Sequence, residues 1–165
     1  MATSNAGRAG ATSRFSTDVQ KAALAVGAVF LLVGILGFIP GITTDYDSMT
    51  FAGHESGARL LGIFDVSILH NLVHLAFGVA GLLLARTWSG ARGFLIGGGV
   101  IYLVLWLYGL VIDFEKPINF IPVNSPDNWL HFALGVVMVL LGVLLSRRPE
   151  LERGVDRPGT RPTAR

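Results

Sequence analysis

Four stretches of the chain contain no charged side chain, and apolar residues occupy every side of them. They cover residues 22–44, 66–85, 93–112 and 128–146. A helix needs ~20 residues at 1.5 Å each to cross ~30 Å of hydrocarbon, and lipid contact requires apolar side chains all around it. We therefore predict an all-α fold, a bundle of four transmembrane helices at about residues 19–40, 66–85, 93–112 and 128–146.

The composition agrees with a membrane location. Of the 165 residues, 52% are hydrophobic and only 15% are charged, against a usual ~25%. A water-soluble globule of this size could not bury so much apolar surface. The chain contains no cysteine, which excludes disulfides and cysteine-ligated metal clusters.

The positive charges predict the orientation. Eleven of the 13 Lys and Arg residues lie in the N-terminal region, the link around residues 86–92 and the C-terminal tail. The loops at residues 40–65 and 113–127 hold only Arg59 and Lys116, with seven of the 11 acids. Positive residues stay on the cytoplasmic side, so we expect a multi-pass plasma-membrane protein with both termini in the cytoplasm.

The two ends of the chain are polar. Residues 1–18 and 147–165 carry little apolar mass, so we expect disordered cytoplasmic tails, the second rich in arginine. Acids and prolines interrupt these arginines, which argues against a nucleic-acid partner. The expected partners are membrane lipids, with further copies of the chain or a larger membrane complex as additional possibilities.

The second and fourth predicted helices share a motif. The pattern N-x-x-H-x-A-x-G-V occurs at residues 71–79 and again at residues 128–136. Each copy follows an acidic loop and runs inward, which predicts two helical hairpins related as a parallel repeat. Seven-residue pairs of small residues predict close helix contacts; they are Gly27 with Gly34, Gly78 with Ala85, and Gly135 with Gly142.

Polar side chains inside apolar helices must find partners within the protein. Asn71 and His74 lie on one helical face, as do Asn128 and His131. We predict that these four residues make interhelical polar contacts, with Asn71 meeting His131 and Asn128 meeting His74. This interpretation assigns them a structural role.

Two binding interpretations compete with the structural one. His70 and His74 are four residues apart, a spacing suited to one divalent metal, and His131 could join them. Alternatively, His74 and His131 could be the axial ligands of haem b in a four-helix bundle. The first expectation remains that no cofactor is bound, and no residue is assigned a catalytic role.

The external loops carry two local signals. Residues 53–64 predict a polar turn followed by a short amphipathic piece along the membrane interface. Ser125, Pro126 and Asp127 predict a helix start, with Ser125 as the cap.

The run of residues 60–78, LLGIFDVSILHNLVHLAFG, resembles a family of four-helix bacterial membrane proteins, domain of unknown function 4383. In the L-L-G-x-F…N-x-x-H-N-x-x-H signature of that family, Ser67 stands where Asn is expected. The resemblance covers about residues 20–146 and implies the fold and the membrane location, but no activity. We therefore expect a small polytopic protein with a structural or accessory role, with a metal- or haem-binding protein as the alternative.

Overall fold

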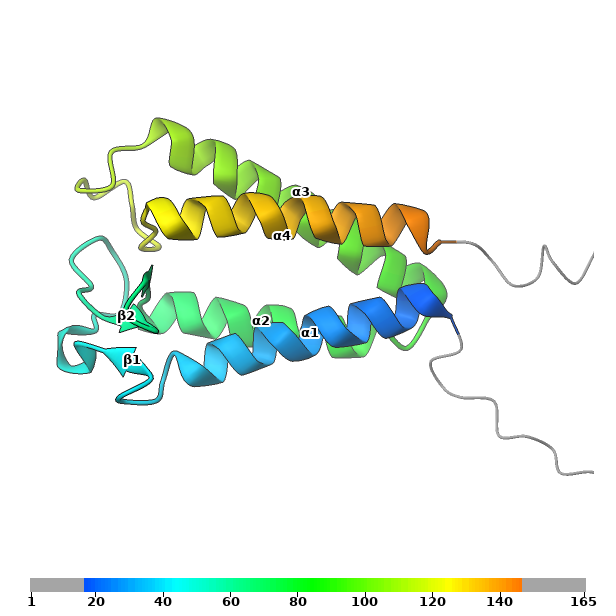
Figure 1. Ribbon diagram of the computed structural model, residues 1–165, viewed down its shortest axis with the longest axis horizontal. Helices are drawn as coiled ribbons and strands as arrows, with labels where there is room; N and C mark the ends of the chain where they lie inside the picture. The colour runs from blue at the N-terminus through cyan, green and yellow to red at the C-terminus, as the bar shows by residue number, and fades with distance from the viewer. Residues whose placement is uncertain (1–16, 147–165) are drawn as a thin grey trace, which may run out of the picture.

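The computed structural model describes residues 17–146, and within them the chain is mostly helical, as predicted (Figure 1). Residues 1–16 and 147–165, which make up almost all of the two predicted tails, lie outside the described residues. The four helices are α1 (Asp18–Leu36), α2 (Ile68–Leu84), α3 (Trp88–Val111) and α4 (Ser125–Leu144). The loop between α1 and α2 adds a short 3-10 turn (Tyr46–Ser48) and three two-residue strands, β1 (Thr43–Thr44), β2 (Arg59–Leu60) and β3 (Phe64–Asp65).

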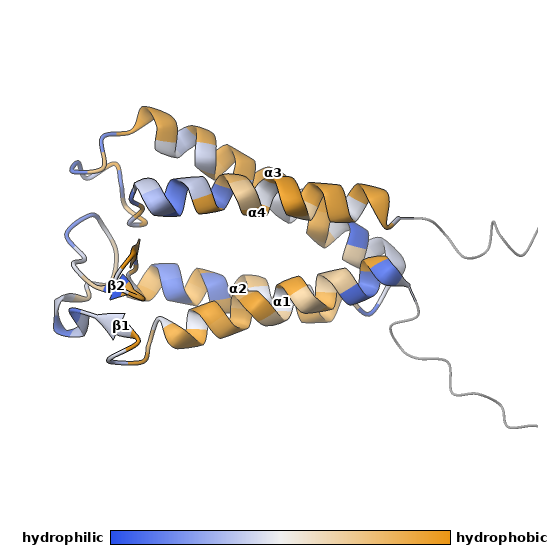
Figure 2. Cartoon of the chain, in the orientation of Figure 1, coloured by the Kyte–Doolittle hydropathy of each residue, from blue (hydrophilic) through white to orange (hydrophobic). Residues whose placement is uncertain are grey.

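Three helices, α1, α3 and α4, are long and apolar enough to cross a membrane. The remaining helix, α2, is also apolar but has only 17 residues. At 1.5 Å per residue it rises ~25 Å, slightly less than the ~30 Å of a hydrocarbon core. Figure 2 shows hydrophilic positions on α2 and α4 near the end that carries the long loops.

Local capping decides where the helices begin and end. Gly37 caps α1, so this helix stops before Pro40. The Ser67 side chain caps α2 by accepting a hydrogen bond from the His70 amide at 3.1 Å. The cap of α4 is Asn124 rather than the expected Ser125, because the Asn124 side chain accepts from the Asp127 amide and completes a capping box.

The helices pack as two hairpins, α1 with α2 and α3 with α4 (Figure 1). Glycines let the backbones approach closely within each hairpin. A Cβ on Gly27 would lie 3.1 Å from the Gly78 carbonyl oxygen, and one on Gly99 would lie 2.8 Å from the Gly135 carbonyl oxygen. The small-residue contacts predicted at Gly27, Gly78 and Gly135 are therefore confirmed, and Gly99 adds a further one.

A small sheet covers the loop end of the first hairpin. Its order is β1-β2-β3, and both pairings are antiparallel. Leu61 and Gly62 turn the chain between β2 and β3 with φ of 56° and 72°. The segment predicted at residues 53–64 thus contains β2 and the turn to β3, and its location along the membrane interface stays a prediction.

Hydrogen bonds join the loops of the two hairpins. The Gly53 amide donates to the Phe120 carbonyl at 2.6 Å, and the Asn124 side chain donates to the Ile63 carbonyl at 2.7 Å.

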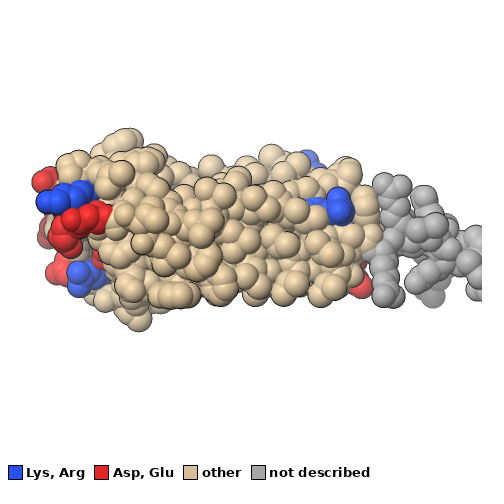
Figure 3. All heavy atoms as spheres, turned by 90° about the horizontal axis from the view of Figure 1, so that it is seen from above, with Lys and Arg blue, Asp and Glu red and all other residues tan. Residues whose placement is uncertain are grey.

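Figure 3 shows charged side chains at the two ends of the described molecule, with a long uncharged section between them. This distribution suits a chain whose middle lies in lipid.

Candidate functional site

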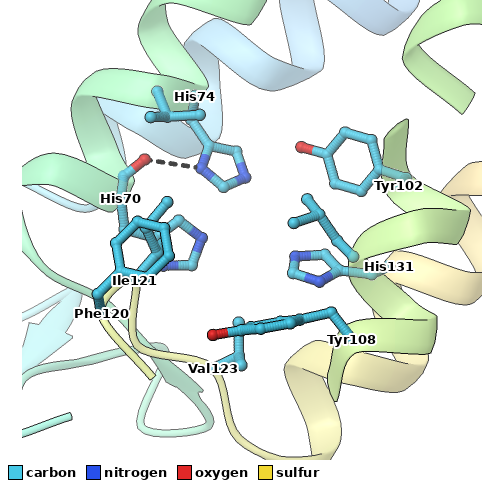
Figure 4. Close-up of a pocket in the computed structure, with 10 residues that line it drawn as sticks. His70, His74, Tyr102, Tyr108, Phe120, Ile121, Val123 and His131 are labelled. Carbon is cyan, nitrogen blue, oxygen red and sulfur yellow. Dashed lines mark hydrogen bonds between the residues drawn. The ribbon is translucent and has the colours of Figure 1, made fainter. Parts of the chain in front are cut away.

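Three histidines from the two hairpins line one crevice near the loop end of the helices (Figure 4). His70 and His74 come from α2, and His131 comes from α4. All three line two cavities of about 140 and 70 Å³. His70 and His131 are only 5% and 6% exposed, so the polar atoms that face the crevice are largely withdrawn from solvent.

Helical spacing brings the first two histidines together. His70 and His74 are one turn apart on α2, and their ring centroids are 4.7 Å apart. The sequence motif therefore correctly places both imidazoles on one face. Tyr102 of α3 joins them, and its ring lies 5.2 Å from that of His131.

The backbone fixes the tautomers of His70 and His74. His70 Nδ1 lies 3.0 Å from the Asp65 carbonyl oxygen, and His74 Nδ1 lies 3.0 Å from the His70 carbonyl oxygen. A carbonyl oxygen only accepts, so each Nδ1 carries the proton and donates it. In the neutral imidazoles, Nε2 is then a hydrogen-bond acceptor.

Two other buried side-chain atoms of the repeated motif have no hydrogen-bond partner among the described residues. They are Nδ1 of His131, which lines the crevice, and Oδ1 of Asn128, which faces Gly109 within the second hairpin. Leaving a buried polar atom unpaired typically costs ~1–3 kcal/mol. The region between the hairpins therefore has more hydrogen-bonding capacity than its own side chains use.

Each asparagine of the repeated motif packs within its own hairpin. A Cβ on Gly37 would overlap the Asn71 amide, and a Cβ on Gly109 would overlap the Asn128 amide. The reciprocal hydrogen bonds expected from Asn71 to His131 and from Asn128 to His74 do not form among the described residues. His74 instead donates to its own helix, because the carbonyl of His70 lies one turn earlier.

Aromatic rings fill the space between the hairpins beside the histidines. Phe30 of α1 contacts His74, with ring centroids 5.8 Å apart, and stacks on Tyr102 at 5.4 Å. Phe77 packs edge-on against both stacked rings. These rings occupy the space beside His74 and His131, and the haem interpretation stays a prediction.

The donor set of the metal interpretation is chemically suitable, since neutral imidazoles bind transition metals. However, within residues 17–146 no three His, Asp or Glu side chains are arranged to hold one metal ion. The structure thus brings His70, His74 and His131 to one crevice without forming a coordination site.

Asp127 links the two hairpins above the histidines, a role that the sequence did not reveal. The residue is 3% exposed and lines the larger cavity. Its Oδ2 accepts hydrogen bonds from the Asp65 amide at 2.9 Å and the Asn124 amide at 3.1 Å. In the sequence, Asp127 with Ser125 and Pro126 indicated a helix start, not a link between the hairpins.

The comparison with family models finds one match, a domain of unknown function (DUF4383), over residues 20–144. No curated protein and no solved structure shows a significant match to the chain.

Proposed function

This chain belongs to the DUF4383 family, and we propose that it is an accessory protein of the plasma membrane that binds a small molecule between its two hairpins. The observation that carries this proposal is the crevice lined by His70, His74 and His131, in which the fixed tautomers leave acceptor nitrogens. Such a crevice between helices of a bundle is a common place for a ligand.

The distribution of charge supports four crossings with both termini in the cytoplasm. The described loops at the histidine end carry most of the acids, whereas Arg86 and Arg92 lie at the opposite end, around the α2–α3 link. Positive residues favour the cytoplasmic side. In this orientation the crevice lies toward the outer leaflet, and a ligand could reach it from the lipid or from outside.

The packing supports binding rather than a purely structural role for the histidines. Each hairpin is closely packed along its glycines, while the space between the hairpins contains both cavities. A site made only for helix adhesion would pair its buried polar atoms. His131 Nδ1 remains unpaired among the described residues, and a ligand could supply the missing partner.

Native mass spectrometry of the full chain, extracted gently from its own membranes, tests this proposal. We expect a bound small molecule on the wild type and on His54→Ala, which changes a histidine of the outer loop. The adduct should be lost from His74→Phe, which keeps an aromatic ring but removes the acceptor.

The absorption spectrum and metal content of the same preparation separate the alternatives. A Soret band, or stoichiometric metal that is lost in His74→Phe, would favour a haem or metal protein instead. A wild-type protein that carries no small molecule at all would favour a purely structural role.

A further inference from the structure

The size of the larger cavity limits its ligand. At about 140 Å³ it is close to an apolar cavity of ~150 Å³ that accommodates one benzene molecule. A single six-membered ring therefore fits this cavity. The adjoining 70 Å³ cavity leaves room for a small substituent.

The walls favour a flat apolar body. Aliphatic and aromatic side chains from both hairpins supply most of the surface, among them Val33, Leu36, Phe64, Leu130 and Leu134. Phe64 supplies an aromatic ring to the larger cavity, and Tyr102 and Phe120 supply aromatic rings to the smaller one. Aromatic side chains favour contact with another aromatic ring.

The polar atoms favour a hydrogen-bond donor on that ring. His74 lines both cavities, and its Nδ1 proton is already committed to the His70 carbonyl. Its Nε2 is thus an acceptor, and it is the less buried of the two acceptor imidazoles on α2. A hydroxyl group on the ligand would satisfy this nitrogen without placing a charge in a low-dielectric site.

We propose that the crevice binds a monocyclic phenol whose hydroxyl group donates a hydrogen bond to Nε2 of His74. The phenol is either a free molecule or the reduced quinol headgroup of a membrane lipid, since the two share this ring and donor. This inference rests on the proposed binding function and specifies its ligand class.

The test uses the full chain in detergent and the probe 4-fluorophenol, followed by ¹⁹F NMR. Its methyl ether, 4-fluoroanisole, has the same ring without the donor. We expect saturable binding of the phenol and at least ~10-fold weaker binding of the ether, as for the loss of one buried hydrogen bond. Empty micelles measure the partition of both probes into detergent.

Variants of His74 separate the hydrogen bond from general packing. His74→Phe should abolish the preference for phenol over ether, and His74→Gln should restore part of it, because the Gln carbonyl reaches a position similar to Nε2. His54→Ala is the matched control and should bind like the wild type. Thermal melting shows whether each variant is folded.

Competition distinguishes the two sources. Displacement of 4-fluorophenol by a short-tailed benzoquinol at a lower concentration than by p-cresol assigns the site to a lipid headgroup, and the reverse order assigns it to a free phenol. Equal binding of phenol and ether, absence of saturable binding, or an unchanged preference in folded His74→Phe would overturn the inference. If a native adduct is nevertheless found, the proposed binding function survives with another ligand class.

Discussion

The ring of Phe30 stacks on the ring of Tyr102, with centroids 5.4 Å apart and planes inclined by 18°. Phe30 belongs to the first hairpin and Tyr102 to the second, so this stack joins the hairpins at their centre. Each ring also contacts a histidine of the repeated motif, Phe30 that of His74 and Tyr102 that of His131. Tyr102 also lines the smaller cavity, so the stack joins the two hairpins beside the crevice.

Removing one ring of this stack should weaken the contact between the hairpins and destabilise the protein. We predict that Phe30→Ala lowers the free energy of unfolding by ~3 kcal/mol or more, because Phe30 is 2% exposed and a large cavity would replace it. Phe51→Ala, at a loop position that is 63% exposed, is the control and should have little effect. Reversible unfolding in detergent measures both, and equal stabilities would contradict a supporting role for the stack.

The helix contacts of the two hairpins occur at corresponding positions. In α1, Phe30 lies three residues after Gly27 and Leu31 lies four residues after it. In α3, Tyr102 and Leu103 follow Gly99 at the same two spacings. Leu31 covers Gly78 of α2, and Leu103 covers Gly135 of α4, its counterpart in the repeated motif. The parallel repeat stays a prediction, and these matching contacts extend it from the second and fourth helices to the first and third.

Two glycines of α3 allow a controlled test of close packing. We predict that Gly99→Ala destabilises the protein by ~1–3 kcal/mol, because its Cβ would lie 2.8 Å from the Gly135 carbonyl oxygen. Gly97→Ala, two residues away, has open space around its Cβ and should be neutral or stabilise the helix by up to ~1 kcal/mol. Thermal melting in one detergent measures both, and a larger loss for Gly97→Ala would refute the assigned helix contact.

Asp127 should hold the loops of the two hairpins together. Asp127→Ala leaves the Asp65 and Asn124 amides without their acceptor, so we predict faster hydrogen exchange at the Asp65 amide and a lower melting temperature. Asp47→Ala changes an exposed carboxylate in the same layer of loops and serves as the control. Unchanged exchange at Asp65 in the Asp127 variant would show that this link does not constrain β3.

Sequence patterns predicted what depends on local spacing. The apolar runs located the four helices, and the one-turn separation of His70 and His74 placed both rings on one face. Side chains that depend on tertiary packing were not foreseen, because their partners are distant in the chain. Tyr102 looked like an ordinary residue of an apolar span, and it lines the crevice only because α3 meets α1 at that level.

The same limit explains the asparagines and the outer loop. The sequence indicated that the amides of Asn71 and Asn128 need partners inside the protein. Only the structure shows that Gly37 makes room for the first amide and Gly109 for the second. The residues of the small sheet form strands of two residues each, too short for an alternating pattern to develop. The turn at Leu61 and Gly62 brings β2 and β3 together, and hydropathy alone could not predict this pairing.

The orientation is the last prediction, and the absence of cysteine makes it directly testable. Single substitutions Glu55→Cys and Glu115→Cys place a thiol in each acidic loop, and Ser89→Cys places one at an exposed position at the start of α3. Because Lys and Arg favour the cytoplasmic side, an impermeant maleimide added to intact cells should label the first two variants. Ser89→Cys should be labelled only after the membrane is permeabilised. Labelling of Ser89→Cys in intact cells, with protection of both loop thiols, would invert the topology and place the histidine crevice toward the cytoplasmic leaflet.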